Sequence, residues 1–257
     1  MWGSNIKSLF ASLLLALVLA APAMTSAVVW ADDGDVVVKK SADPFEGFNR
    51  RVYRFNSKLD RWVLKPITSR YVKHVPPKVR RGVKNVFSNL REPTTIVNDV
   101  LQGKGIQAAK DSFRFVLNST FGILGVFDVA THLNLPRNKE DFGQTMGKWG
   151  VPAGPYLVLP LLGPSSVRDA AGLIPQYAYT DMTAGIEDET LKWSLFATRA
   201  VDARSGLLKS EKILQEQLDP YVFVREAYLQ KRVNDVYDGN PPEEEDDLLN
   251  EILEQGD

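Results

Sequence analysis

Few residues in this chain are of the types that catalysis usually employs. Its two histidines are His74, which lies among lysines and arginines, and His132, which lies in a polar segment. Neither belongs to a zinc-binding pattern such as HExxH. Asp128 and Asp141 are formally candidates for a general acid and a general base, but nothing in their spacing connects them. We expect two independent, solvated carboxylates.

Hydrolytic and nucleotide-dependent chemistry is equally poorly represented. Residues 163–167 read GPSSV and lack the second glycine of the GxSxG nucleophile elbow. The other glycines form neither a P-loop nor a dinucleotide fingerprint. The sequence contains no cysteine, so it offers no thiolate nucleophile or thiolate metal ligand. It therefore predicts a protein that is not an enzyme and that uses no metal or cofactor.

Residues 1–31 are typical of a secretory signal peptide. Lys7 is the only charged residue before a run of mostly Leu, Ala and Val from Leu9 to Ala21, and small residues follow. This is the pattern of a cleaved signal. A membrane anchor is the alternative, although a spanning helix needs roughly 20 apolar residues. We expect cleavage after Ala31 and export from the cytoplasm.

The remaining sequence predicts one mostly α-helical domain at 43–238, preceded by a linker at 32–42 and followed by an acidic tail at 239–257. Apolar residues recur at helical spacing after Pro77, and we expect that helix to end at Pro93. Further helices are expected at 106–117, at 190–208 and from Pro220 to about Val236. Alternating strand patterns with hairpin turns are scarce.

Two apolar stretches do not fit an ordinary soluble helix. Residues 115–127 are too short and too interrupted by glycine to span a bilayer, and their length is typical of core or interfacial segments. Residues 151–164 contain four prolines and two glycines, which exclude a regular helix and a central strand. That segment is either an apolar loop that plugs a core or irregular backbone that lines a wet cavity.

Charge is balanced overall and uneven locally. The net charge of −1 gives no general attraction to nucleic acid. The basic stretch at 70–84 is either a solvated helix face or a contact for anionic lipid headgroups. In the tail, an acidic run is followed by four aliphatic residues on one face of a short predicted helix. These four residues are Leu248, Leu249, Ile252 and Leu253.

Separate motifs over residues 43–235 resemble the MlaA (VacJ) family. In chain order they include DPFEGFNR at 43–50, NLREP at 89–93, RFVLN at 114–118, FGQTMGKWG at 142–150 and DPY at 219–221. The resemblance covers essentially the whole predicted domain. It is specific because so many separate motifs occur in one order.

The resemblance implies an outer-membrane protein that removes mislocalised phospholipid from the outer leaflet and so maintains lipid asymmetry. Members of this family form a helical ring that is embedded in the membrane around an amphipathic channel. They bind outer-membrane porin trimers and pass lipid to a periplasmic carrier of the MlaC type. The expected partners are therefore phospholipid, a porin trimer and that carrier, with no nucleic acid.

The expected location is the periplasmic side of the outer membrane. Many family members are lipoproteins, whereas this sequence has no cysteine to acylate. We therefore expect attachment without a lipid, through apolar surface and a porin. Two other functions stay open at this stage. One is a soluble periplasmic carrier that encloses a lipid, and the other is a lipase that uses His132 and an unassigned serine.

The resemblance also places a mobile hairpin beside the channel, at residues 151–164. Flexible and stiff positions alternate there, because Gly150 and Gly154 flank Pro152 and precede Pro155. We expect the loop to swing about its glycines as a gate. The alternative is a static apolar plug.

The parts of this expected gate have separate roles. Tyr156, Leu157 and Leu159 are expected to present an apolar tip to acyl chains. Phe55 and Asn56, near the start of the domain, are expected to hold the gate in its resting state.

The resemblance assigns two further contacts. Lys192 matches a lysine that the family places at the channel, where its ammonium would meet a lipid phosphate as a point charge. The alternative is an ordinary exposed lysine. The four aliphatic tail residues are expected to dock in a groove of the periplasmic carrier, or else to belong to a solubilising tail whose periodicity is accidental.

Overall fold

The computed structural model describes residues 43–183 and 185–241. The predicted signal peptide, the linker and the tail residues Leu248, Leu249, Ile252 and Leu253 lie outside the described residues. The elements are α2 Glu46–Leu59, η1 Asp60–Leu64, α3 Lys65–His74, α4 Pro77–Leu101, α5 Gly105–Thr120, α6 Val129–His132, α7 Phe142–Lys148, β1 Tyr156–Leu159, β2 Gly163–Ser166, α8 Val167–Pro175, η2 Gln176–Thr180, α9 Glu189–Leu207, η3 Leu208–Ser210, α10 Glu211–Gln215 and α11 Pro220–Val236. The mostly α fold class is confirmed.

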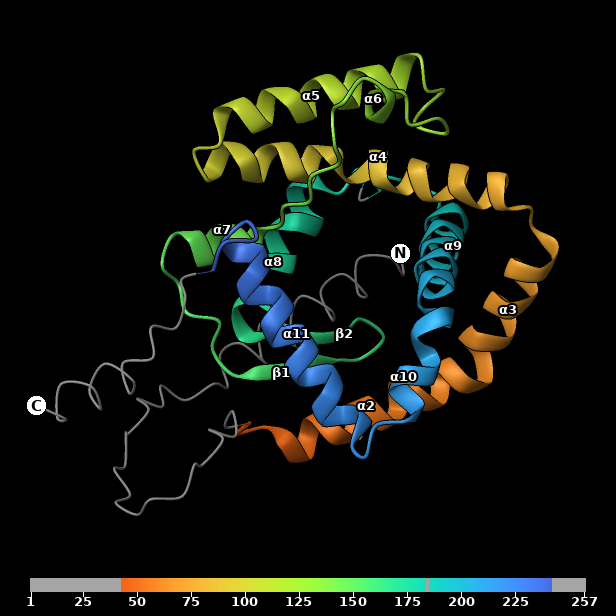
Figure 1. Ribbon diagram of the computed structural model, residues 1–257, viewed down its shortest axis with the longest axis vertical. Helices are drawn as coiled ribbons and strands as arrows, with labels where there is room; N and C mark the ends of the chain where they lie inside the picture. The colour runs from red at the N-terminus through yellow and green to blue at the C-terminus, as the bar shows by residue number, and fades with distance from the viewer. Residues whose placement is uncertain (1–42, 184, 242–257) are drawn as a thin grey trace, which may run out of the picture.

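The helices follow one another around a circuit (Figure 1). In that view α2, α3 and α4 run along the bottom, the right and the top, and α7, α8 and α11 complete the left side. Helix α5 packs on the outer side of α4 as a second layer. Helix α9 lies inside the circuit, against α3 and α4.

The predicted helices at 106–117, 190–208 and 220–236 are confirmed as α5, α9 and α11. The prediction that Pro93 ends its helix is wrong, because α4 continues to Leu101. An internal proline loses one backbone hydrogen bond and costs about 3 kcal/mol. Contacts on both sides of Pro93 offset that cost: Glu92 pairs with Arg114 of α5, and the Thr94 hydroxyl donates to Thr180.

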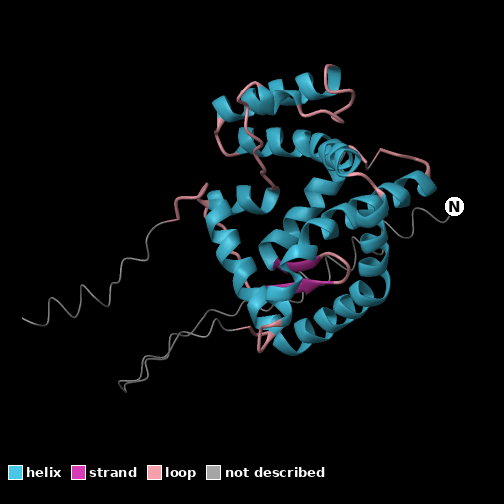
Figure 2. Ribbon diagram, turned by 45° about the vertical axis from the view of Figure 1, so that its right-hand side comes forward, coloured by secondary structure: helices cyan, strands magenta, loops and turns pink. Residues whose placement is uncertain are grey.

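The segment at 151–164 contains a strand that its sequence pattern did not predict. Strands β1 and β2 form an antiparallel hairpin in which Tyr156 pairs with Ser166 and Leu159 with Gly163. Figure 2 shows the two strands in magenta, enclosed by helices. Both strands of a two-stranded sheet are edges, and Pro164 is tolerated in β2 for that reason.

Polarity is distributed unusually in this fold. Buried polar side chains outnumber buried hydrophobic ones among the described residues, and every buried residue of α4 is polar. A small apolar cluster lies where the hairpin meets α2 and α11, and it is built on Tyr156, Val158 and Tyr221. Within 43–183 and 185–241, no helix combines the length and the apolar character that a membrane crossing requires.

Candidate functional site

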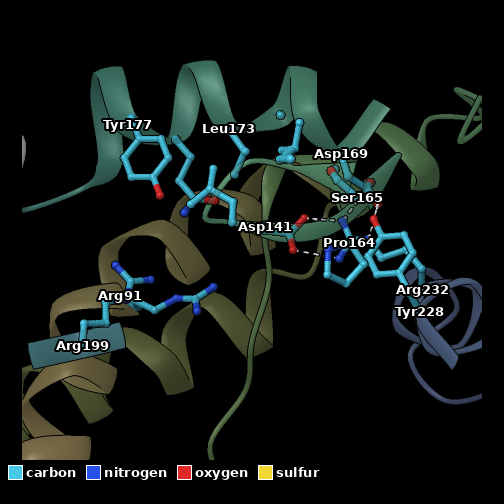
Figure 3. Close-up of a pocket in the computed structure, with 15 residues that line it drawn as sticks. Arg91, Asp141, Pro164, Ser165, Asp169, Leu173, Tyr177, Arg199, Tyr228 and Arg232 are labelled. Atoms are coloured by element: carbon cyan, nitrogen blue, oxygen red, sulfur yellow. Dashed lines mark hydrogen bonds and ion pairs between the residues drawn. The ribbon is translucent and has the colours of Figure 1, made fainter. Parts of the chain in front are cut away.

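A cavity of about 250 Å³ lies where α4, α7, the hairpin, α8, η2, α9 and α11 converge. Its lining is amphipathic (Figure 3). Leu159, Leu162 and Leu173 supply apolar surface. The polar part contains three arginines and two aspartates, which gives the lining a net formal charge of +1.

An arginine clamp ties three helices together at one side of this cavity. Arg232 of α11 donates to both oxygens of Asp141, at the start of α7, over 2.6 and 2.8 Å. The same guanidinium donates to Asp169 of α8 over 2.7 and 3.0 Å. The hydroxyl of Tyr228 also donates to Asp169. One guanidinium charge is therefore shared between two carboxylates, and Arg168 brings a second cation to Asp169 over 3.1 Å.

The clamp keeps both carboxylates ionised. Burial opposes ionisation of Asp141, but the hydrogen bonds and the charge of Arg232 outweigh burial and hold its pKa below the usual value. The pKa of Asp169 is lowered by the same balance of burial against Arg232. Burial and the neighbouring Asp169 raise the pKa of the Tyr228 phenol, so it stays a hydrogen-bond donor at neutral pH.

Two glycines allow the helices to approach at the clamp. A Cβ on Gly143 would lie 2.4 Å from Arg232 Nη2 and 2.4 Å from Asp169 Oδ1. A Cβ on Gly172 would lie 2.7 Å from the backbone nitrogen of Gly143. Any side chain at either position would push α7 and α8 apart, so these glycines serve packing at the cavity wall.

The hairpin is attached to α2 by two asparagine side chains. The Asn49 amide donates to the Tyr156 carbonyl over 2.9 Å and accepts from the Val158 nitrogen over 2.9 Å. Asn56, two turns along the same helix face, donates to the Leu159 carbonyl over 2.9 Å and accepts from Leu161 over 3.0 Å. The two amides thus occupy the free edge of β1 as a neighbouring strand would.

The three residues of the predicted apolar tip are buried rather than exposed, although Leu159 also lines the cavity. Tyr156, Leu157 and Leu159 are at most 5% exposed, because β1 is bonded to β2 on one side and to the asparagines of α2 on the other. The exposed apolar residues of the hairpin are Leu161 and Leu162, in the turn between the strands.

The glycines of the expected hinge have the backbone conformation that the prediction assumes. Gly150 and Gly154 have φ of +86° and +68°, which other residues rarely adopt. Pro155 follows, and its carbonyl accepts from the Val167 nitrogen over 3.1 Å. Whether the segment moves is not tested by these angles, so the gate stays a proposal.

Phe55 and Lys192 belong to different helices, α2 and α9. Phe55 is exposed on α2, where it shares a surface groove with Arg51 and Arg54. Lys192 lies near the start of α9 and is half-buried. Helix α9 lies inside the circuit, yet none of its residues is buried. The channel role of Lys192 remains a proposal.

The prediction of two solvated carboxylates is wrong for both Asp128 and Asp141. Asp128 pairs with Arg114 and Arg137 over 3.1 and 2.7 Å. Burial disfavours its ionisation, but the Thr131 hydroxyl and the two guanidinium groups overcome this effect and lower its pKa to about 2. Asp141 belongs to the separate Arg232 clamp, so the two aspartates form no acid–base pair.

Neither histidine is part of a reactive group. His74 is exposed, with its Nδ1 2.9 Å from the Arg70 carbonyl, and His132 is exposed at the end of α6. In the part of the chain that the structure describes, no hydrogen bond joins His132 to a serine, and no cluster of acidic and histidine side chains has the makings of a metal site.

Comparison with known proteins places the chain in a family. A sequence model of the family described as MlaA lipoprotein matches residues 41–235. The chain belongs to the MlaA family. The intermembrane phospholipid transport system lipoprotein MlaA of Escherichia coli (strain K12) is 36% identical over 199 residues, which cover 74% of this chain and 76% of the relative. The MlaA of Haemophilus influenzae is 33% identical over 223 residues, covering 85% of this chain and 88% of the relative.

The relationship extends to the fold. A structure solved in work on the structural basis for maintenance of bacterial outer membrane lipid asymmetry superposes with a TM-score of 0.68. It is 33% identical in sequence and covers 77% of this chain and 100% of the other. The MlaA relatives are named as components of a transport system rather than as enzymes, and they are named lipoproteins, whereas the present sequence contains no cysteine.

Several site residues of this MlaA-family chain were missed by sequence reasoning. Asn49 had a usable signal, since it lies seven residues before Asn56 and thus on the same helix face. Arg91, Arg199 and Arg232 had none, because surface arginines of ordinary helices look the same in a sequence. Only the fold brings these three into one cavity.

Proposed function

We propose that this protein removes mislocalised phospholipid from the outer leaflet of the outer membrane through an amphipathic channel inside its helical circuit. It then hands the lipid to a periplasmic carrier of the MlaC type. It acts as a transporter and breaks no bond. The family membership and the names of the MlaA relatives support transport of phospholipid, and the polarity of the fold supports the route.

The observation that carries this proposal is the inverted polarity of the α4–α5 layer. Large apolar side chains at the end of α5 and in the following turn face outward. Phe121 and Leu124 are each 74% exposed and Ile123 is 63% exposed. Soluble monomers rarely expose so much contiguous apolar surface. Between α4 and α5, in contrast, charged and amide side chains are buried. Of the two interpretations of residues 115–127, this favours the interfacial segment over the core.

The physical demands of lipid transfer fit such a protein. A two-chain phospholipid carries about thirty methylenes, each costing about 0.8 kcal/mol to expose to water. Its headgroup charge meets the opposite penalty in hydrocarbon. A route for the whole molecule needs one polar wall and one apolar wall. The cavity beside the hairpin is lined by both arginines and leucines, so it offers polar and apolar surface.

The hairpin is the proposed gate of this route. Gly150 and Gly154 form the hinge, the amide of Asn56 holds β1 in the resting position, and Leu161 and Leu162 meet the acyl chains. Replacing both glycines with valine removes the positive-φ conformation. The double variant is expected to mimic a deletion in outer-membrane permeability at normal protein abundance. Full activity in that variant would make the hairpin a static plug.

Lys192 and the tail complete the proposal. The substitution Lys192→Glu is expected to impair lipid clearance without changing abundance, and unimpaired clearance assigns Lys192 to the ordinary surface. Truncation after Asn240 is expected to weaken binding to the carrier while leaving membrane attachment intact. An unchanged affinity for the carrier would exclude docking by the tail.

Attachment is proposed to rest on the apolar outer surface and on a porin trimer. Detergent, and not high salt, is then expected to release the protein from outer membranes. Release by salt alone would favour the soluble carrier. The cavity counts against that carrier, because about 250 Å³ falls below the 300–1,000 Å³ that drug-sized ligands occupy and cannot enclose a two-chain lipid.

The deciding experiment is a gene deletion with measurement of phospholipid in the outer leaflet. The deletion strain is expected to accumulate outer-leaflet phospholipid, and the wild-type gene is expected to reverse this. A matched strain carries Arg51→Gln and Arg54→Gln, which alter only the exposed face of α2, and it is expected to behave as wild type. An unaltered outer leaflet in the deletion strain would refute the proposal. Release of fatty acid by the purified protein would establish the lipase instead.

A further inference from the structure

Two arginines in the cavity have no counter-ion among the described residues. Arg91 extends from α4 and Arg199 from α9, and Figure 3 shows both on the side of the cavity opposite the Arg232 clamp. Neither guanidinium makes a hydrogen bond or ion pair with another residue among those that the structure describes. The two residues are far apart in sequence, so their meeting is a property of the fold.

The nearest carboxylates are already engaged. Asp141 contributes to the potential at Arg91, but both of its oxygens accept from Arg232. Asp181 also acts on Arg91 from a distance, and its Oδ1 accepts from the nitrogen and the hydroxyl of Thr183. The cavity therefore keeps uncompensated positive charge where Arg91 and Arg199 lie.

The arrangement is electrostatically unfavourable when the cavity is empty. Burial lowers the pKa of Arg91, and the charge of Arg199 lowers it further. Lys139 adds a third cation nearby, since burial and then Arg91 lower the pKa of its ammonium. Arg91 and Lys139 are exposed and Arg199 is half-buried, so an anion can reach these neighbouring cations, and sharing it relieves their mutual repulsion.

We propose that Arg91 and Arg199 form a phosphate-binding site that holds the headgroup of a phospholipid while its acyl chains lie along the hairpin. The inference rests on the proposed function and names a headgroup site within its route. Guanidinium groups match phosphate oxygens with paired, charge-assisted hydrogen bonds. Leu162 and Tyr177, which line the same cavity, supply the apolar surface next to the phosphate.

The test measures equilibrium binding to the purified full chain in detergent with three probes. They are dihexanoylphosphatidylglycerol, dihexanoylglycerol, which has the same chains and no phosphate, and inorganic phosphate. The double variant Arg91→Gln/Arg199→Gln is expected to bind the phosphatidylglycerol about 10-fold to 100-fold more weakly, as loss of charge-assisted hydrogen bonds predicts. Its binding of dihexanoylglycerol is expected to be unchanged. Arg91→Lys/Arg199→Lys keeps both positive charges but loses the paired N–H donors of the guanidinium groups. Its affinity for the phosphatidylglycerol is expected to lie between those of the wild type and the glutamine variant.

The controls separate the possible results. Arg51→Gln/Arg54→Gln removes two arginines outside the cavity and is expected to bind all probes as wild type does. Unchanged phosphatidylglycerol binding in the Arg91/Arg199 variant overturns the site, and so does an equal loss for dihexanoylglycerol, which would mark a packing defect. Arginine-dependent binding of inorganic phosphate that exceeds lipid binding identifies the source as a free anion.

The same variants distinguish this inference from the function on which it rests. If the Arg91→Gln/Arg199→Gln strain clears outer-leaflet phospholipid as well as wild type, the headgroup site fails and the transport function stands. If the wild-type protein clears no outer-leaflet phospholipid, yet binds inorganic phosphate through the two arginines, the transport function fails and the anion site stands.

Discussion

The α4–α5 layer and the hairpin cluster are stabilised in opposite ways. Between α4 and α5 the buried groups are charged or amide side chains, centred on Arg114, whose side chain is 1% exposed. At the hairpin the cluster is apolar and aromatic, with Asn49, Ser165 and Ser166 as buried polar neighbours. Tyr221 packs edge-on against Tyr53 and Tyr156, with ring centroids 5.7 and 6.2 Å apart. The hairpin cluster resembles the core of a soluble protein, whereas the α4–α5 layer buries mainly polar groups.

The difference between the two regions is the one expected if their surfaces face different surroundings. A layer that faces hydrocarbon gains little from burying more hydrocarbon, so polar contacts and close packing hold its helices together. Polar groups there are buried in protein because lipid cannot satisfy them. A region that faces water still gains from apolar burial. The contrast supports the proposal that α5 and the turn after it face the membrane, while the hairpin cluster lies in the interior of the protein.

The largest expected effect is at Arg114. Its guanidinium lies 3.1 Å from Asp128 and 3.4 Å from Glu92, and burial raises the pKa of Glu92 to about 7. Arg114→Met leaves Asp128 partly buried with one cation fewer, and we expect a loss of about 3–5 kcal/mol in the free energy of unfolding. Denaturant unfolding in detergent measures it.

The matched variant for that comparison is Val158→Ala in the hairpin cluster. Removing two methyl groups from a 2% exposed valine is expected to cost about 1–3 kcal/mol. A larger loss for Val158→Ala than for Arg114→Met would mean that the two regions rest on the same apolar forces, and the contrast drawn above would not hold.

A local effect is expected when the hairpin loses its attachment to α2. Asn49→Ala leaves the Tyr156 carbonyl and the Val158 nitrogen without partners, and each buried unsatisfied group costs about 1–3 kcal/mol. Hydrogen exchange is expected to speed up at the β1 amides and to stay unchanged in α5. Asn56→Ala acts on the more exposed end of the same edge and serves as the milder partner. Faster exchange spread evenly over both regions would contradict a local attachment.

The pH dependence of stability is expected to come from the polar layer. Burial raises the pKa of Asp99 to about 8, and the neighbouring Asp111 adds to the shift. Between the unfolded value of about 4 and about 8 the folded state binds more protons than the unfolded state. Stability contributed by Asp99 is therefore fully present below about pH 4 and is lost as pH rises through that window.

Asp99→Asn removes this titration. The variant is expected to gain about 1–3 kcal/mol relative to wild type at pH 8 and to show a flatter profile between pH 5 and 8. Unfolding midpoints at several pH values in detergent measure the difference. Parallel profiles for the two proteins would place the pH sensitivity elsewhere.

The smallest effect on folding is expected on the outer apolar face. Phe121→Ser/Leu124→Ser changes two exposed side chains and should alter stability in detergent by no more than about 0.5 kcal/mol. The same variant is expected to bind less to vesicles without detergent. Leu207→Ser/Ile213→Ser, at side chains 60% and 52% exposed in α9 and α10, is the matched control. Equal losses in both variants would remove the membrane assignment of the α5 side.

Much of the local structure was predictable because its causes are local. Helix α11 begins where Asp219 caps the backbone nitrogens of Tyr221 and Val222 and Pro220 fills the first position. The helices at 106–117 and 190–208 show apolar spacing along short stretches of chain. Gly150 and Gly154 could be expected at positive φ for the same reason, since backbone freedom belongs to the residue itself.

Other features were decided only by tertiary structure, because they depend on partners distant in sequence. Pro93 would end an isolated helix, whereas contacts with α5 and η2 stabilise α4 beyond this residue. From the sequence, Tyr156 and Leu159 were expected in an exposed tip. Hydrogen bonds from the asparagines of α2 and the pairing with β2 hold them in the interior instead. Local periodicity contains no information about which distant side chain completes a hydrogen bond or which cation shares a cavity. The sequence by itself determined the helices and the family, whereas the fold decided that Arg91 and Arg199 face one space without a counter-ion.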